Sequence, residues 1–161
     1  MRITTKGRYA LRASLALAML AKNGAPVSIN TLAESENISL VFLEQIFFKL
    51  RKAGIVSSTR GPNGGFCFAR PLDNITVKQL IDAAGEKLEF PFCNKRLNDC
   101  QRLDTCISHY VWLDVMDMVN DYFNNITLAS ILKKHDDETA ILNQNNAPTP
   151  RSETRNGTTY S

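Results

Sequence analysis

Three cysteines and one histidine lie close together in the second half of the chain. Cys93, Cys100, Cys106 and His109 have the spacing C-x6-C-x5-C-x2-H. Thiolates and imidazoles are the ligands that zinc and iron–sulfur clusters take in proteins. Cys106 and His109 are three residues apart at the expected start of a helix, so they share one face of it. Cys93 and Cys100 fall in a stretch without periodicity, which we expect to form a loop able to wrap around a bound group.

More than one bound group fits these four residues. An iron–sulfur cluster needs four ligands, usually thiolates, and histidine can replace cysteine. Three cysteines and a histidine also hold structural zinc, although zinc sites favour ligand pairs two to four residues apart. The gaps of six and five residues therefore favour a cluster over a single ion, and thiols without a metal remain a third interpretation.

No catalytic arrangement stands out in the sequence. A nucleophile–base pair of Cys106 and His109 is conceivable, but two more cysteines nearby and no sign of a pocket argue against it. The glycines near residue 63 lack the lysine and helix of a phosphate-binding loop. We therefore do not expect an enzyme.

The charge of the chain is distributed unevenly. The net charge is +3, but residues 1–70 carry ten Lys and Arg against three acids, whereas residues 71–161 carry nine against thirteen. A basic N-terminal half favours a polyanionic partner, most often nucleic acid, although a solvated basic surface would give the same distribution.

Composition also bears on the compartment. No stretch approaches the roughly 20 apolar residues that span a bilayer, and charges recur early with no signal-peptide cleavage site. We expect a cytoplasmic protein without membrane association, whose four cysteines are ligands or redox groups rather than structural disulfides.

The elements that would position these residues begin with helices. Apolar residues recur at helical spacing over 8–23, 29–37 and 40–53, and Ser28 and Ser39 can cap the second and third helices. Two helices joined by a turn of three or four residues form a helix-turn-helix. On the third helix we expect Leu40, Leu43, Ile46, Phe47 and Leu50 to form the buried stripe.

A β-hairpin is expected directly after these helices. Residues 55–59 and 66–70 flank a Gly/Pro/Asn-rich loop, the pattern of two short strands. A further helix follows over 76–85. The predicted fold is mainly α with a small β-hairpin wing, a winged helix-turn-helix DNA-binding domain over residues 1–85.

The C-terminal half is predicted to bind the cluster and a second subunit. Residues 86–106 would form the cluster-binding loop, 107–135 a long helix and a short final helix, and 136–161 a disordered tail. The long helix is apolar over most of its circumference and must be covered on more than one side, which predicts a homodimer. The predicted dimerisation residues are Ile107, Val111, Val115, Met118, Val119 and Tyr122.

The second helix of a helix-turn-helix lies in the major groove of DNA. On its outward side Gln45 suits adenine, Glu44 can accept from a cytosine amino group and Val41 can touch a thymine methyl. Phe42 and Phe48 are also placed on that side. The whole predicted DNA-binding set is Arg2, Lys6, Arg8, Ser39, Val41, Glu44, Gln45, Lys49, Arg51, Lys52 and Arg60.

Within that set the basic residues suit phosphates, and Arg60 at the tip of the wing suits a narrow minor groove. Glu44 is different, because phosphates repel a carboxylate and burial in the groove removes its water. It is tolerated only where a donor meets it, so it should act by penalising wrong sites. The competing interpretation is a solvated helix residue paired with Lys49.

Several segments resemble the IscR-type iron–sulfur cluster transcriptional regulators, a winged-helix family that also includes nitric-oxide, iron and cysteine sensors. They are residues 1–10 (MRITTKGRYA), 38–40 (ISL), 43–47 (LEQIF), 50–54 (LRKAG), 56–58 (VSS), 60–66 (RGPNGGF), the Cys106-x2-His109 pair followed by Trp112, and 124–128 (NNITL). The resemblance covers residues 1 to about 134.

The resemblance implies a dimeric DNA-binding regulator with a [2Fe–2S] cluster on Cys93, Cys100, Cys106 and His109. It implies control of cluster-assembly genes, with cluster occupancy changing the DNA sites bound through Glu44, and cluster-delivery scaffold proteins as further partners. Related sensors carry a different cluster or none. The chain departs from the pattern at the first cysteine gap, where five residues are expected instead of six, and at Val41, where serine is expected.

Overall fold

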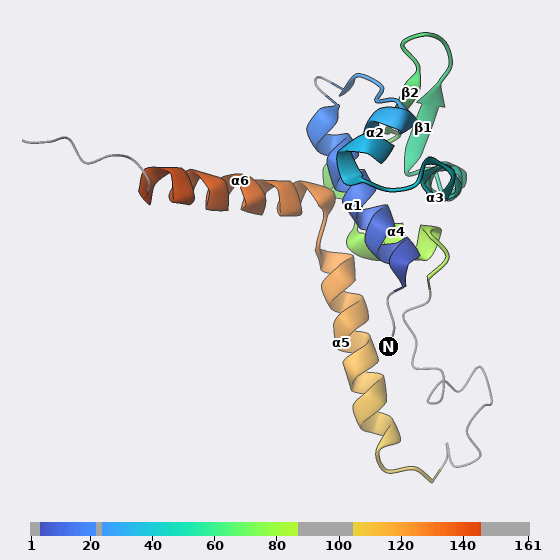
Figure 1. Cartoon of the computed structure of the whole chain (residues 1–161). Coiled ribbons are helices and arrows are strands. Elements are labelled where there is room, and N and C mark those ends of the chain that lie inside the picture. The colour runs from blue at the N-terminus through green and yellow to red at the C-terminus, as the bar shows by residue number, and fades with distance from the viewer. Residues whose placement is uncertain (1–3, 22–23, 87–104, 146–161) are drawn as a thin grey trace, which may run out of the picture.

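A computed structural model describes residues 4–21, 24–86 and 105–145 (Figure 1). Cys93, Cys100 and Arg2 lie outside the described residues. The elements in chain order are α1 (Thr5–Leu20), α2 (Ile29–Glu36), α3 (Leu40–Lys52), β1 (Val56–Thr59), β2 (Gly65–Phe68), the 3-10 helix η2 (Leu72–Asn74), α4 (Val77–Ala83), α5 (His109–Asn125) and α6 (Leu128–Asn145). The predicted fold class, mainly α with a β-hairpin wing, is confirmed.

The first three helices pack around one core. Ala10, Ala13 and Leu17 of α1 are fully buried, and the two small alanine side chains let the neighbouring helices approach closely. The Ser28 hydroxyl caps α2 by accepting from the Thr31 amide at 3.0 Å, as predicted. Asn37 ends α2 in the left-handed conformation, with φ of 50°, and makes the short turn into α3.

The wing is an antiparallel hairpin paired from Val56–Phe68 to Thr59–Gly65. Phe66 of β2 also exchanges two backbone hydrogen bonds with Val27, at 2.9 and 2.8 Å, so the hairpin is tied to the chain before α2. Gly65 is required there, because a Cβ would overlap the Val27 backbone. Phe47 of α3 packs against the Phe66 ring, which joins the wing to the core.

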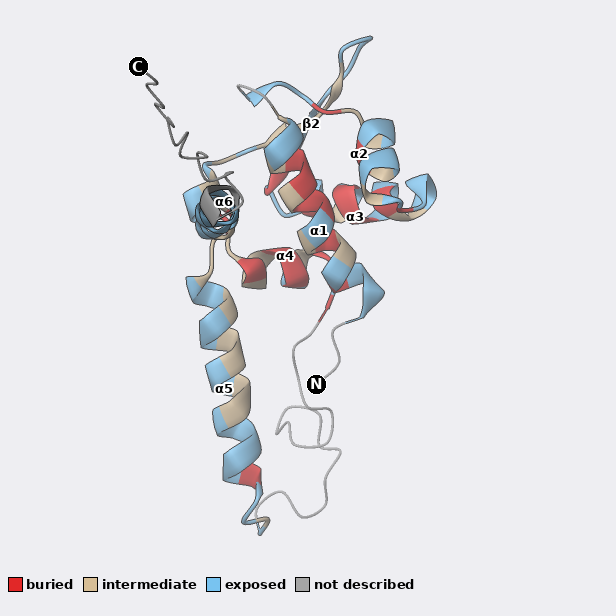
Figure 2. Ribbon diagram, turned by 60° about the vertical axis from the view of Figure 1, so that its left-hand side comes forward, coloured by how far each residue is buried: buried red, intermediate tan, exposed pale blue. Residues whose placement is uncertain are grey.

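The C-terminal helices attach to the core at one place. Thr76 caps α4 in a capping box with Gln79 and forms an antiparallel bridge with Thr127, between α5 and α6. The Val77 amide donates to Ile126 O and the Leu128 amide to Ile75 O, both at 2.9 Å. From this junction α5 and α6 extend in different directions, and burial is concentrated in α1–α4 (Figure 2).

One boundary prediction and one burial prediction need correction. The final helix, predicted to end near His135 before a disordered tail, continues to Asn145, so residues 136–145 are helical. Leu40, predicted in the buried stripe of α3, is 38% exposed because it stands in the first turn, outside the packed side of the helix.

No helix among the described residues has the length and apolarity to cross a membrane.

Candidate nucleic-acid interface and metal ligands

The two sides of α3 have different roles. Leu43, Ile46, Phe47 and Leu50 are buried and anchor the helix in the core. The predicted base-reading residues Val41, Glu44 and Gln45 are all exposed on the other side. Ser39, just before the helix, is exposed and makes no side-chain capping bond, so its hydroxyl remains available to a partner.

Glu44 has no ion pair among the described residues. Its suggested partner Lys49 points elsewhere, with Nζ donating to the Ala84 carbonyl of α4 at 2.9 Å. An exposed carboxylate that has no counter-ion in the described part of the chain, on the side of α3 predicted to face DNA, is what the filtering hypothesis for Glu44 requires.

The phosphate candidates surround this surface. Lys6 and Arg8 are exposed in the first turns of α1, and Lys52 is exposed at the end of α3. Arg51 is ordered by two neighbours: Nη1 donates to the Ser58 hydroxyl of β1 at 3.1 Å, and the guanidinium lies 5.7 Å from the Phe48 ring centre. Arg60 is exposed where the wing loop begins.

His109 and Cys106 are the described members of the predicted ligand set. His109 is only 4% exposed, yet neither of its ring nitrogens has a hydrogen-bond partner in the described part of the chain. The His109 amide donates to the Cys106 carbonyl at 3.1 Å, which holds the two residues in one turn, and Cys106 Sγ lies 3.1 Å from the Ser108 hydroxyl. No group of three possible ligands forms among the described residues.

Unsatisfied buried imidazole nitrogens need an explanation, because buried polar side chains nearly always find a partner. Imidazole nitrogen is also a preferred ligand of iron and zinc. The pair of Cys106 and His109 therefore fits half of a four-ligand metal or cluster site.

Comparisons with known proteins agree with a DNA-binding role for the chain. Residues 3–134 match the Rrf2 family model, described as an iron-dependent transcriptional regulator. The chain belongs to the Rrf2 family. The HTH-type transcriptional regulator IscR of Pectobacterium carotovorum is 41% identical over 132 residues, which cover 82% of this chain and 79% of that protein.

Solved structures place the chain in the same family. IscR of T. potens is 32% identical with a TM-score of 0.67, and the match covers 84% of this chain and 88% of that one. CymR, the global cysteine regulator of B. subtilis, is 28% identical with a TM-score of 0.69, covering 83% and 98%. This Rrf2 regulator is thus an IscR-type winged-helix DNA-binding protein.

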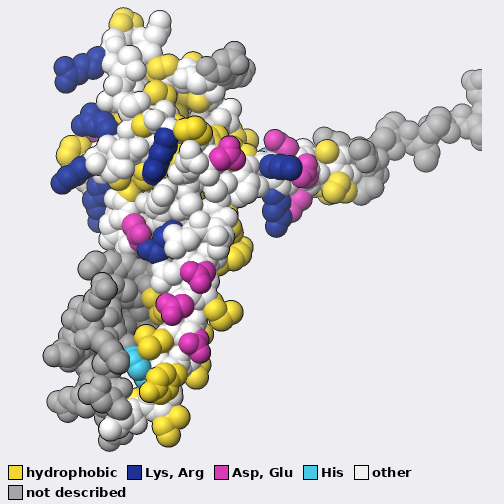
Figure 3. Space-filling view, turned by 180° about the vertical axis from the view of Figure 1, so that it is seen from behind, with side chains coloured by type: hydrophobic (Ala, Val, Ile, Leu, Met, Phe, Trp, Pro, Cys, Tyr) yellow, Lys and Arg dark blue, Asp and Glu magenta, His cyan; other side chains and the backbone are white. Residues whose placement is uncertain are grey.

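In this Rrf2 regulator α5 presents an apolar stripe outward. Val111, Met118 and Tyr122, all predicted dimerisation residues, are exposed, with Met118 at 70%, and Val115 is half-buried. Ile107, also predicted, is exposed but lies just before α5 begins. Figure 3 shows hydrophobic and acidic side chains together on the exposed surface of α5. Residues at 111, 115, 118 and 122 alternate gaps of four and three, the spacing of a helix–helix seam.

Three predicted orientations are corrected by neighbouring helices. Val119 packs with Met116 and Phe123 against Val77 and Ile81 of α4, so it lies on the intrachain side of α5. Phe42 is half-buried and meets the Tyr9 ring edge-on at 5.8 Å. Lys49, predicted to bind phosphate, is half-buried against α4.

Two residues of the site were missed from the sequence. Ser58 is the partner of Arg51, and its place on the exposed strand β1 of the wing was the available signal. Glu86 is a buried acid that accepts from the Thr4 amide at 3.4 Å and from the Thr4 hydroxyl. An acid directly after the helix-ending Gly85 carries no local signal of burial.

Proposed function

We propose that this regulator changes its choice of DNA sites with the occupancy of a [2Fe–2S] cluster held by Cys93, Cys100, Cys106 and His109, and that it controls genes for iron–sulfur cluster assembly. The observation that carries the proposal is the buried His109 imidazole, whose two nitrogens have no partner among the described residues and which stands one turn from Cys106. The IscR relatives support it.

When bound, the cluster would supply a redox couple and a covalent link between α5 and the residues before it. The chain's own part is to exclude water and to aim the imidazole. His109 lies at the start of α5, 4% exposed, and its amide bond to the Cys106 carbonyl keeps both ligands together. Its histidine ligand would raise the cluster potential above that of an all-cysteine set.

The DNA-binding residues divide into base and backbone contacts. Gln45, Val41 and Glu44 would meet base edges, while Arg51, held by Ser58 and Phe48, would meet a phosphate. Two copies joined through the exposed stripe of α5 would present two recognition helices to a two-fold site in a cytoplasmic, homodimeric regulator. Cluster-delivery scaffold proteins would be transient partners.

The first test is the metal content of anaerobically purified protein. We expect about two irons and two sulfides per chain together with visible absorption. One zinc without sulfide would refute the cluster and support the alternative, a zinc-stabilised winged-helix module. About four irons and four sulfides would instead indicate a related nitric-oxide- or iron-responsive repressor.

The chain offers a matched control for the ligand assignment. His109→Ala should lower the iron and sulfide content severalfold, and His109→Cys should retain both with a lower reduction potential. His135→Ala removes the second histidine, which is exposed on α6, and should change neither. Equal cluster content in all three variants would exclude His109 as a ligand.

The wing assignment has its own test. Arg60→Ala should weaken binding to duplexes with narrow A/T-rich minor grooves and leave G/C-rich ones less affected. Arg60→Lys keeps the charge and should recover part of the affinity. Unchanged binding by Arg60→Ala would refute a role for the wing tip.

A further inference from the structure

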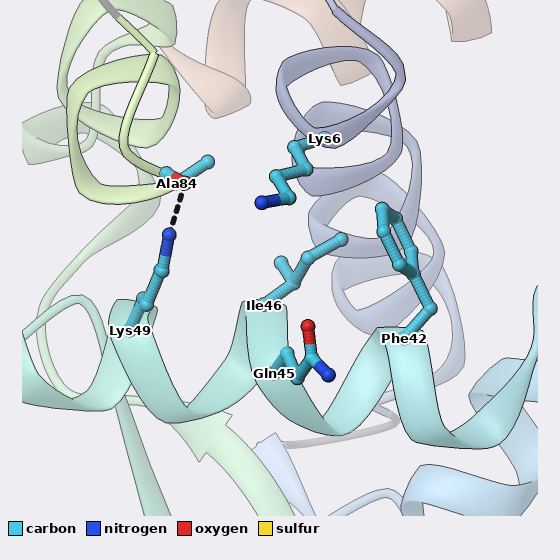
Figure 4. Close-up of a pocket in the computed structure, with 6 residues that line it drawn as sticks. All are labelled: Lys6, Phe42, Gln45, Ile46, Lys49 and Ala84. Carbon is cyan, nitrogen blue, oxygen red and sulfur yellow. Dashed lines mark hydrogen bonds between the residues drawn. The ribbon is translucent and has the colours of Figure 1, made fainter.

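Lys49 uses its ammonium inside the protein rather than on the DNA-facing surface. Its Nζ donates to the Ala84 carbonyl at 2.9 Å, across a small cavity that is also lined by Lys6, Phe42, Gln45 and Ile46 (Figure 4). The next residue, Gly85, has φ of +89°, and a Cβ there would lie 2.8 Å from Nζ. The ammonium therefore fills the space that a side chain at position 85 would need.

This contact suits the end of a helix. The last carbonyls of α4 have no intrahelical partner, and the C-terminal end of a helix carries partial negative charge. A lysine satisfies both needs with one hydrogen bond. Lys49 would have to give up this bond to reach a phosphate, whereas Lys52 on the same helix is exposed and has no such bond in the described part of the chain.

The same short segment is held from its other side. Glu86, buried at 8% exposure, accepts from the Thr4 amide at 3.4 Å and from the Thr4 hydroxyl. Thr4 caps α1, whose first turns carry Lys6 and Arg8. Residues 84–86 are thus bonded to both helices that carry predicted DNA contacts, and in the sequence they lead directly to the stretch containing Cys93 and Cys100.

We propose that Lys49 is a positioning residue of the recognition helix, which through Ala84 couples ligand binding at the cysteine–histidine set to the choice of DNA site. This inference rests on the proposed function. When the cysteine–histidine set binds its ligand, a shift of residues 84–86 moves the Ala84 carbonyl. Because Lys49 is bonded to this carbonyl, the shift is transmitted to α3. Gln45 and Glu44 lie on α3 within the turn and a half before Lys49. The differential contact that an allosteric link requires is this hydrogen bond.

The first experiment separates docking on α4 from contact with DNA. Affinity for a duplex selected by the wild-type protein from a random pool is measured against salt concentration. Each lost phosphate contact should reduce the slope of log K against log[salt] by about 0.9. Lys49→Met should leave the slope unchanged. Lys52→Met removes the same charge from an exposed position and should reduce the slope by the amount given for a lost phosphate contact. A slope reduced by about 0.9 for each bound subunit, or about 1.8 for the proposed dimer, in Lys49→Met would overturn the proposal.

The second experiment measures the coupling. Duplexes are selected separately with loaded and with cluster-free wild-type protein, and the affinity ratio for the two is determined in both states. In Lys49→Met the change of that ratio on loading should fall at least threefold, while Lys52→Met keeps it. Lys49→Arg, which can still donate to the carbonyl, should restore part of the change. A full wild-type change in Lys49→Met would refute the coupling.

Gly85→Ala tests the same contact from the other side. The added Cβ would displace the Lys49 ammonium and strain a backbone at φ of +89°. It should reproduce the lost coupling with Lys49 intact, and it keeps the test decisive if Lys49→Met is poorly folded. Coupling equal to wild type in Gly85→Ala would count against the proposal.

Failure of the proposed function looks different. If wild-type protein with iron and sulfide bound shows the same affinity ratio as cluster-free protein, loading does not control site choice. The salt dependence still decides in that case whether Lys49 is docked on Ala84 or bound to phosphate.

Discussion

The helices α3 and α5 both carry an apolar stripe, but α3 buries its stripe and α5 leaves one exposed. On α3, Phe47 and Leu50 are at 0% exposure, and the free side presents Glu44 and Gln45 together with Val41 and Phe48. α5 packs on α4 through one side only and leaves Met118 and Tyr122 exposed. A free side with polar and charged residues suits a hydrated duplex, whereas an exposed apolar seam suits another protein surface. The difference separates the predicted DNA-binding element from the predicted subunit contact.

The largest expected effect tests the buried side of α3. Phe47→Ala should lower the free energy of unfolding by about 3–5 kcal/mol, because it opens a cavity in the core. Its neighbour Phe48 is 59% exposed, so Phe48→Ala should cost less than about 1 kcal/mol. Urea unfolding of both variants measures the contrast, and equal losses would mean that the two sides of α3 are wrongly assigned.

The free side of α5 is tested by a charge. Met118→Glu should raise the dissociation constant of the homodimer at least tenfold, which corresponds to about 1.4 kcal/mol, because a carboxylate would be buried in an apolar seam. Asp117→Asn, on the adjacent acidic side, is the control and should leave assembly unchanged. Sedimentation equilibrium gives the constants, and a dimer unaffected by Met118→Glu would place the interface elsewhere.

The free side of α3 should affect selectivity more than affinity. Glu44→Ala should reduce the ratio between preferred and rejected duplexes about tenfold, by strengthening binding to the rejected ones. Glu34→Ala removes an exposed carboxylate from α2 and should leave the ratio unchanged. Competition binding measures both, and weaker binding to every duplex by Glu44→Ala would contradict the filter.

The smallest effect compares an ion pair in the N-terminal helical core with one on the C-terminal helix α6. Arg12 and Glu36, 3.0 Å apart, join α1 to α2, and Arg12 also bonds the Glu36 carbonyl. Arg12→Met should cost up to about 1 kcal/mol of unfolding free energy. Lys134 and Glu138 on α6 are 3.9 Å apart and more exposed, so Lys134→Met should change nothing measurable. A larger loss in Lys134→Met would show that α6 is packed against a partner.

The sequence predicted the elements whose packing leaves a periodic pattern. The core stripe of α3 and the strands around the glycine-rich loop follow from apolar spacing and turn residues. The extension of α6 could not be read this way, because residues 133–142 are all exposed and no buried side imposes a pattern. Bonds from Thr139 to the His135 carbonyl and from Lys134 to Glu138 are local, and local bonds do not distinguish a helix from a polar tail.

Contacts between side chains of different helices were the second feature that the sequence could not predict. Phe42 and Lys49 lie at the edges of the outward side of α3, where helical spacing allows either orientation. Contacts with Tyr9 of α1 and Ala84 of α4 decide it, and neither partner can be identified from α3 alone. Of the ligand set, the spacing predicted Cys106 and His109 on one face at the start of a helix, whereas α5 begins at His109 and Cys106 lies in the turn before it. All four ligand assignments remain predictions.

Leu128 makes the folding of the N-terminal unit depend on a residue far along the chain. It is fully buried in the same core as α1–α3, and its amide satisfies the Ile75 carbonyl at 2.9 Å. A fragment ending at residue 85 would lack both, together with the Ile126 carbonyl that accepts from Val77. During synthesis the N-terminal unit therefore completes its core only once residue 128 has left the ribosome, when the predicted ligands and the predicted dimerisation residues are already translated.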